Sequence, residues 1–147
     1  MNVRQAEVDD SAEWLRLRAL LWPGEPAAEL AREAAAMLDG GDDTRPLVAE
    51  RAGGGLAGFI EVRLRPYADG CSTSPVGYIE GWYVDADLRR QGIGAALVAA
   101  AEAWARAQGC REMASDAELE NRGSHAAHGR LGYEEVERVI RYRKALP

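Results

Sequence analysis

The sequence has few of the features that mark secreted, metal-binding or membrane proteins. It contains two cysteines, Cys71 and Cys110, which match no metal or redox spacing, so we expect free thiols, no disulfide and no bound metal. The longest apolar run, residues 93–101, is too short to cross a bilayer. The first ten residues have no apolar segment behind a basic head. We therefore expect a cytoplasmic protein with no membrane partner.

The sequence also lacks an excess of basic residues. Its 18 lysines and arginines are outnumbered by 24 aspartates and glutamates, which gives a formal net charge of -6 at pH 7. Nucleic acids are bound by clustered lysine and arginine, so we expect no nucleic-acid partner. A cationic ligand fits this charge better.

The length and composition are those of one folded unit. The 147 residues are 47% hydrophobic and 29% charged, which suits a packed globule rather than a disordered chain. A chain of this length has room for one ordinary domain, so we expect a single domain over residues 1–147.

Helical periodicity is clearest in three segments. The first begins after Asp10 and ends before Pro23, and the second begins near Pro26 and ends at Gly40. The third covers residues 93–108, is rich in alanine and has apolar residues on one face. A fourth, shorter helix is expected near residues 124–131.

The remaining periodic segments predict strands. We expect strands at residues 47–50, 56–64, 78–84, 111–115 and 135–143. The first two form a hairpin across three consecutive glycines. Gly81 lies inside the third strand, where a glycine often marks a bulge. This order of elements predicts a mixed sheet with helices on its faces.

The segment that follows the 78–84 strand carries the most chemical information. A turn with Gly92 and Gly94 opens the long helix, where backbone N–H groups and the helix dipole favour an anion such as a diphosphate. Arg89 and Arg90 add positive charge there. A Walker loop needs Gly-Lys-Ser/Thr, and a dinucleotide fingerprint needs glycines directly after the strand; neither is present. An ordinary helix-initiating turn is the alternative to a phosphate loop.

The spacing of Arg89, Gly92 and Gly94 matches the pattern Arg/Gln-x-x-Gly-x-Gly/Ala, and in this the sequence resembles the GNAT superfamily of N-acetyltransferases. Other stretches are similar to aminoglycoside 6'-N-acetyltransferases: residues 74–81, residues 114–116, Asn121 and residues 131–133. The resemblance covers most of the chain. It implies the GNAT fold, an α+β (α/β three-layer) arrangement with a mostly antiparallel mixed sheet. It also implies acetyl transfer from acetyl-CoA to the 6'-amino group of an aminoglycoside, which confers resistance.

The resemblance also assigns site residues. The cofactor-binding positions are Trp82, Tyr83, Val84, Arg89, Arg90, Gln91, Gly92, Ile93, Gly94, Ala95 and Asn121. The substrate-binding positions are Trp22, Tyr67, Glu80, Asp116 and Glu137. Carboxylates suit an aminoglycoside because it carries several ammonium groups. Taken singly, an acidic residue here is most simply a solvated surface charge, and a tryptophan is most simply a core residue.

The expected reaction assigns catalytic roles. A protonated amine must lose a proton before it attacks a thioester, and either Glu80 or Asp116 is placed to take it, directly or through water. A backbone N–H at Val84, beside the expected bulge, is our hypothesis for an oxyanion donor. Many GNAT enzymes carry a proton-donating tyrosine four residues before a Gly-Phe/Tyr pair, where this chain has His128. His128 either supplies that proton, or it packs near the cofactor or faces solvent.

Two other functions remain open at this stage. The chain could act on another cationic amine, such as a polyamine, an amino acid or a peptide. A non-catalytic module that binds acyl-CoA would need the glycine turn but not the carboxylates. The resemblance further implies a homodimer formed through the last strand, because an open strand edge favours pairing.

Overall fold

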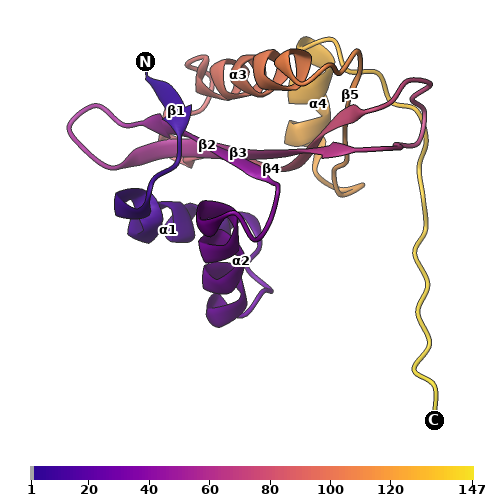
Figure 1. Ribbon diagram of the computed structural model, residues 1–147, viewed down its shortest axis with the longest axis horizontal. Helices are drawn as coiled ribbons and strands as arrows, with labels where there is room; N and C mark the ends of the chain where they lie inside the picture. The colour runs from indigo at the N-terminus through magenta and orange to yellow at the C-terminus, as the bar shows by residue number, and fades with distance from the viewer. Residues whose placement is uncertain (1) are drawn as a thin grey trace.

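The computed structural model of the chain describes residues 2–147. Its centre is a five-stranded sheet in the order β1-β2-β3-β4-β5 (Figure 1). The strands are β1 (Val3–Gln5), β2 (Arg45–Glu50), β3 (Leu56–Arg65), β4 (Val76–Val84) and β5 (Met113–Ser115). All neighbouring pairs are antiparallel except β4 and β5, which are parallel. The predicted mixed, mostly antiparallel sheet is confirmed.

Helices cover both faces of this sheet (Figure 1). On one face lie α1 (Ser11–Leu21) and α2 (Ala27–Asp39), and on the other lie α3 (Ile93–Ala107) and α4 (Arg122–Arg130). Short 3-10 turns, η1 (Val8–Asp10) and η2 (Ala86–Leu88), precede α1 and follow β4. The three-layer arrangement is confirmed. Within residues 2–147, no helix has the length and apolar character needed to cross a membrane.

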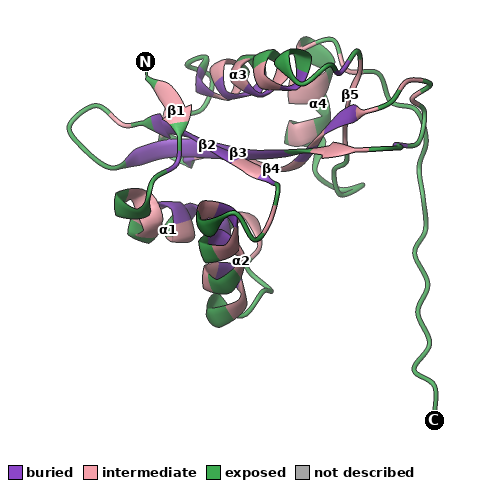
Figure 2. Ribbon diagram, in the orientation of Figure 1, coloured by how far each residue is buried: buried purple, intermediate pink, exposed green. Residues whose placement is uncertain are grey.

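The α1 and α2 side of the sheet has its own apolar core. Trp14 and Leu17 of α1 and Ala34 of α2 pack with Val48 and Phe59 from the sheet. The outer sides of both helices are exposed (Figure 2). Helix α2 ends at a glycine with φ +86, a left-handed conformation that glycine adopts without strain. Both helices therefore lie in the segments that the sequence predicted, with their apolar residues toward the sheet.

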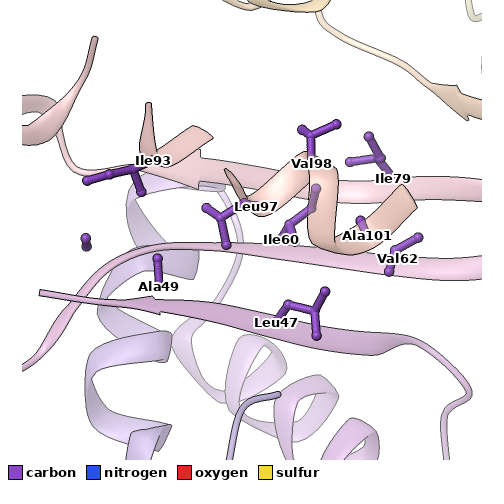
Figure 3. Close-up of a cluster of buried hydrophobic side chains, with 10 residues drawn as sticks. Leu47, Ala49, Ile60, Val62, Ile79, Ile93, Leu97, Val98 and Ala101 are labelled. Carbon is purple, nitrogen blue, oxygen red and sulfur yellow. The ribbon is translucent and has the colours of Figure 1, made fainter. Parts of the chain in front are cut away.

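The α3 side holds a second core (Figure 3). Leu97, Val98 and Ala101 of α3 lie against Ile60 and Val62 of β3. The two β3 residues alternate with Phe59 and Glu61, whose side chains point to the other face. Burial of this apolar surface stabilises the fold by about 25 cal/mol per Å².

An irregularity in β4 positions the site. In the β3–β4 register Glu61 faces Gly81 and Val62 faces Ile79, so Glu80 is an extra residue on β4. The bulge expected at the strand glycine is therefore present, one residue earlier. Strand β5 pairs with β4 only as far as Ile79. Beyond that point β4 has an open edge.

The two ends of the sheet differ from the prediction. Strand β1 was not expected, because three residues carry too little periodicity to read. The strand expected at residues 135–143 is absent, and the segment is exposed and extends away from the rest of the chain (Figures 1 and 2). Its apolar alternation is real, with Ile140 78% exposed and Tyr142 88% exposed. A strand also needs a neighbour to pair with, and this segment has none among residues 2–147.

Candidate active site

The open edge of β4 offers backbone donors. The Asp85 N–H donates to the Ala57 carbonyl at 2.8 Å, which points this amide toward β3. Successive N–H groups of a strand point to alternate sides, so the N–H of Val84 points to the open edge, and so does that of Trp82. This orientation is what the oxyanion hypothesis for Val84 requires. That role stays a prediction.

Asp85 fixes the start of the loop that leaves β4. Its buried carboxylate accepts from Arg16 Nη2 at 2.8 Å and from Arg51 Nη2 at 2.8 Å. The hydrogen bond from Arg16 holds the pKa of the Asp85 carboxyl below its usual value, with Arg51 acting in the same direction. Sequence reasoning missed Asp85, because its partners come from α1 and from the turn that follows β2 (Figure 1).

The segment from residue 89 to residue 95 lies where the sequence placed it: it runs from the turn after β4 into the first residues of α3. Gly92 has φ +85 and precedes the first residue of α3. The Arg89 guanidinium is folded back, with Nε donating to the Val84 carbonyl at 2.9 Å. A methyl group at Gly94 would lie 3.2 Å from the Trp82 ring, so helix and strand approach closely there. The loop has the geometry of an anion site at a helix N-terminus.

The two candidate bases are joined through two other side chains. The Arg65 guanidinium donates to Glu80 from Nε at 3.0 Å and from Nη2 at 2.8 Å, and its carbon lies 3.5 Å from the Tyr78 ring centroid. The Tyr78 phenol donates to Asp116 Oδ2 at 2.5 Å. Burial raises the pKa of Tyr78, and the bond to Asp116 adds to the shift. The structure thus brings Glu80 and Asp116 into one cluster beside the point where β4 and β5 separate.

A cavity of about 220 Å³ lies next to Glu80. Its charged and aromatic lining residues are Arg18, Trp22, Glu33, Asp42, Glu61, Arg63 and Glu80, so four acidic side chains face two arginines. Trp22 is half-buried and supplies an aromatic wall. The cavity is thus an acidic, partly aromatic recess, which suits a cationic ligand.

Two other predicted substrate contacts, Tyr67 and Glu137, lie outside the cluster of Glu80 and Asp116. Tyr67 is exposed in the β3–β4 loop, where its phenol donates to Asp69 Oδ1 at 2.5 Å. Glu137 is exposed in the C-terminal segment, which passes the same loop, since a methyl group at Gly70 would lie 2.8 Å from the Val136 side chain. Their substrate-binding role stays a prediction.

His128 is packed and hydrogen-bonded near the end of β5. Its Nδ1 lies 2.7 Å from the Ser124 carbonyl, which can only accept, so Nδ1 carries a proton. Its Nε2 lies 2.9 Å from Ser115 Oγ. The ring makes edge contacts with Trp82 and Tyr133 at centroid distances of 5.3 and 5.7 Å. In neutral His128 the Nε2 atom is therefore an acceptor of the Ser115 proton.

The other predicted residues have plain local roles. Asn121 precedes α4, and its Oδ1 accepts from the Ser124 N–H at 3.1 Å, which leaves its amide N–H groups for a ligand. Cys71 and Cys110 are free, and burial raises the pKa of both thiols, opposite to what a nucleophile needs. Across residues 2–147 no cluster of three or more histidine, cysteine or acidic side chains has metal-site geometry.

The open edge of β4 thus lies beside the glycine turn that begins α3. The model of the Acetyltransferase (GNAT) family matches residues 14–133. The chain belongs to this family.

Particular members resemble it over their full length. The chain is 46% identical to aminoglycoside N(6')-acetyltransferase type 1 of Klebsiella aerogenes, over 98% of this chain and 96% of that protein. It is 44% identical to the protein of the same name from Stenotrophomonas maltophilia, over 99% and 94% of the two chains.

The fold is also similar to solved structures of aminoglycoside 6'-N-acetyltransferases. AAC(6')-Iy in complex with the bisubstrate analog CoA-S-monomethyl-acetylneamine has a TM-score of 0.90 and 38% identity, over 99% of this chain and 98% of that chain. The apo 6'-N-acetyltransferase AAC(6')-IG of Acinetobacter haemolyticus has a TM-score of 0.90 and 35% identity, over the whole of both chains.

Proposed function

We propose that the protein transfers the acetyl group of acetyl-CoA to the 6'-amino group of an aminoglycoside and thereby confers resistance. The observation that carries this proposal is the Glu80–Asp116 cluster at the β4–β5 split, on a fold that closely matches a protein solved with a CoA–aminoglycoside bisubstrate analog. Full-length similarity to aminoglycoside N(6')-acetyltransferases supports it.

Acetyl-CoA binds along the open edge of β4 in this proposal. The backbone of Trp82, Tyr83 and Val84 pairs with the pantetheine arm as a strand would. The loop from Arg89 to Ala95 surrounds the pyrophosphate with backbone N–H groups and positive charge. The side-chain amide of Asn121 adds a donor at the start of α4.

The aminoglycoside occupies the acidic recess. Trp22 provides an apolar face, and Glu80 and Asp116 attract the ammonium groups of the substrate. Tyr67 and Glu137 contact the far end of the substrate from the β3–β4 loop and the C-terminal segment. The net charge of -6 favours the approach of such a polycation.

Asp116 is the base in this account. The Glu80 oxygens are held by Arg65, whereas within residues 2–147 the side chain that donates to Asp116 is the neutral Tyr78 phenol. The neutral amine then attacks the thioester, and the Val84 N–H stabilises the oxyanion. His128 can protonate the thiolate from Nε2 only when doubly protonated, because its neutral tautomer has no proton there.

The protein acts as a cytoplasmic homodimer in this proposal. The C-terminal segment exposes a row of large apolar side chains: Val136, Val139, Ile140, Tyr142 and Leu146. Contiguous exposed apolar surface of this kind marks a protein interface. A second copy of the chain would supply the neighbouring strand that the segment lacks.

The test is an assay of CoA thiol release with purified protein, acetyl-CoA and two aminoglycosides that differ only at position 6'. Release with the 6'-amino compound and none with the 6'-hydroxyl compound is expected. If neither compound is acetylated while a polyamine or a peptide is, the family assignment stands and the substrate proposal is wrong.

A further inference from the structure

The Trp22 indole lies between the buried guanidinium of Arg18 and the backbone of Gly81. The Arg18 guanidinium carbon lies 4.9 Å from the centroid of the Trp22 ring. At Gly81 of β4, a methyl group would lie only 2.5 Å from Trp22 Cη2, so the ring rests directly on this glycine. The position of the indole therefore depends on Arg18 and on the absence of a side chain at Gly81.

Arg18 itself cannot move freely. Its Nε donates to Glu61 Oε2 at 2.8 Å, its Nη2 donates to Glu61 Oε1 at 3.0 Å, and its Nη1 donates to the Leu30 carbonyl at 3.0 Å. Arg18 and Glu61 are each 2% exposed, and the Trp14 indole N–H also donates to Glu61 at 3.0 Å. A longer bond from Nη1 reaches the partly exposed Glu33 Oε1 at 3.3 Å, and the bonds to Glu61 and Leu30 are buried, so the guanidinium is a rigid support.

The supports on the two sides of the indole are themselves connected. Glu61 on β3 faces Gly81 on β4 at the register shift that makes Glu80 an extra residue. Glu61 fixes Arg18, Arg18 lies over Trp22, and Trp22 rests on Gly81. The four residues form a closed set of contacts, and Arg18, Trp22, Glu61 and Glu80 all line the 220 Å³ cavity.

We propose that Arg18 and Gly81 are positioning residues that hold the Trp22 indole as a fixed wall of the acceptor cavity. This inference rests on the proposed function for the identity of the acceptor. A ring that is already immobile costs less conformational entropy when it binds a sugar or an ammonium group.

A role in fold stability explains the buried Arg18–Glu61 pair less well than a positioning role. Buried ion pairs contribute little net stability, because desolvation offsets much of the attraction, and apolar replacements of similar volume are often neutral or stabilising. A planar, hydrogen-bonded guanidinium lying over an indole instead fixes the position and orientation of the ring. Because Trp22 lines the same cavity as Glu80, the fixed ring forms part of the proposed acceptor site.

Substitutions at Gly81 and Trp22 test the contact from the ring side. Gly81→Ala places a methyl group where the ring lies, so the indole must shift. We expect the KM for a 6'-amino aminoglycoside to rise about tenfold, with the KM for acetyl-CoA unchanged. Trp22→Ala should raise the KM for the aminoglycoside by a similar factor. The KM of the double variant should equal that of Trp22→Ala, because both substitutions remove the same interaction between the indole and the substrate.

Substitutions at Arg18 test the contact from the other side. Arg18→Met combined with Glu61→Gln removes both buried charges together, and Glu33, which Arg18 Nη1 also contacts at 3.3 Å, is partly exposed and stays solvated. Arg18→Lys keeps a positive charge but loses the planar group. Both should raise the KM for the aminoglycoside, the first more than the second. The matched control is Arg32→Met with Glu29→Gln, which removes an exposed ion pair on α2, with Arg32 Nε 3.0 Å from Glu29 Oε2, and should leave both KM values unchanged.

A fluorescence measurement separates this inference from the proposed function. Acrylamide quenching of Trp22, taken as the difference between each protein and its Trp22→Phe counterpart, reports ring mobility without any substrate. Greater quenching in Gly81→Ala and in the Arg18–Glu61 double variant is expected, even if no aminoglycoside is acetylated. Unchanged quenching in these folded variants would overturn the positioning role, and so would an unchanged aminoglycoside KM in an enzyme that acetylates the antibiotic.

Discussion

The Arg65 guanidinium holds both carboxylate oxygens of Glu80, at 3.0 Å from Nε to Oε1 and at 2.8 Å from Nη2 to Oε2. This pairing makes the two acidic residues of the cluster unequal. Glu80 is paired with a cation that orients it, whereas Asp116 is contacted by the neutral phenol of Tyr78. We expect the two carboxylates to differ in the kinetic parameter that each controls.

Asp116→Asn should lower kcat by about 100-fold, because it removes the proposed proton acceptor. Glu80→Gln should instead act mainly by raising the KM for the aminoglycoside. Steady-state kinetics with the concentration of each substrate varied in turn will distinguish the two effects. Equal losses of kcat in both variants would contradict the division of roles. Glu118→Gln, an exposed acidic residue beyond the cluster, is the control.

Tyr78→Phe should lower kcat/KM for the aminoglycoside by about tenfold, because the phenol no longer orients the Asp116 carboxylate. Acetyl-CoA binding, measured by calorimetry, should not change. Tyr142→Phe, which alters an exposed phenol, is the matched control. A Tyr78→Phe enzyme with wild-type kinetics would show that the hydrogen bond to Asp116 has no catalytic consequence.

Asp85→Asn should reduce the free energy of unfolding by about 1–2 kcal/mol, since two partly exposed guanidinium groups lose their shared carboxylate. The folded-state pKa of Asp85 lies below its ordinary value of 3.8, chiefly because of the bond from Arg16. Its stabilisation is therefore fully present above that ordinary value and is lost as the pH falls through the folded-state pKa.

Denaturant unfolding from neutral to acid pH checks this expectation. The difference between wild type and Asp85→Asn should be constant at neutral pH and should shrink below about pH 4. The variant should also bind acetyl-CoA more weakly, because Asp85 anchors the start of the cofactor loop. A difference in stability that does not depend on pH would be inconsistent with a charged Asp85.

Ile140→Asp should dissociate the proposed homodimer without destabilising the monomer. Ile140 is 78% exposed within its own chain, so the new charge meets no packed surface there. Analytical ultracentrifugation of both proteins gives the answer. Wild-type protein that sediments as a monomer, or a variant that remains dimeric, would refute an interface at the C-terminal segment.

Cys71→Ala and Cys110→Ala should both retain wild-type turnover. Burial raises the pKa of each thiol, so little thiolate is present near neutral pH, and direct transfer needs no acyl-enzyme. Electrospray mass spectrometry after mixing with acetyl-CoA should find no acetylated protein. Loss of turnover in either variant would reopen covalent catalysis.

Much of the fold follows from local pattern. Helix α3 and its glycine loop could be predicted because alanine content, apolar spacing and the left-handed Gly92 all act within a few residues. The hairpin of β2 and β3 could be predicted because its glycines adjoin both strands. The error at residues 135–143 has the same origin: the alternation is present, but a strand also needs a partner.

The contacts that organise the site could not be predicted. Arg65 reaches Glu80 only because the β4 bulge adds one residue there, and no local pattern reveals that register. Arg18 finds Glu61 across 43 residues of sequence through the docking of α1 on the sheet. Family resemblance pointed to Glu80 and Trp22 but not to the arginines that hold them.

The position of the acetyl group on the product tests the central claim most directly. Purified enzyme would be incubated with acetyl-CoA and a 6'-amino aminoglycoside, and the product would be analysed by mass spectrometry and two-dimensional NMR. We predict a single added acetyl group, with its amide on the 6' nitrogen. An acetyl group on another nitrogen or on a hydroxyl, or unmodified antibiotic beside an enzyme that binds acetyl-CoA, would contradict the account.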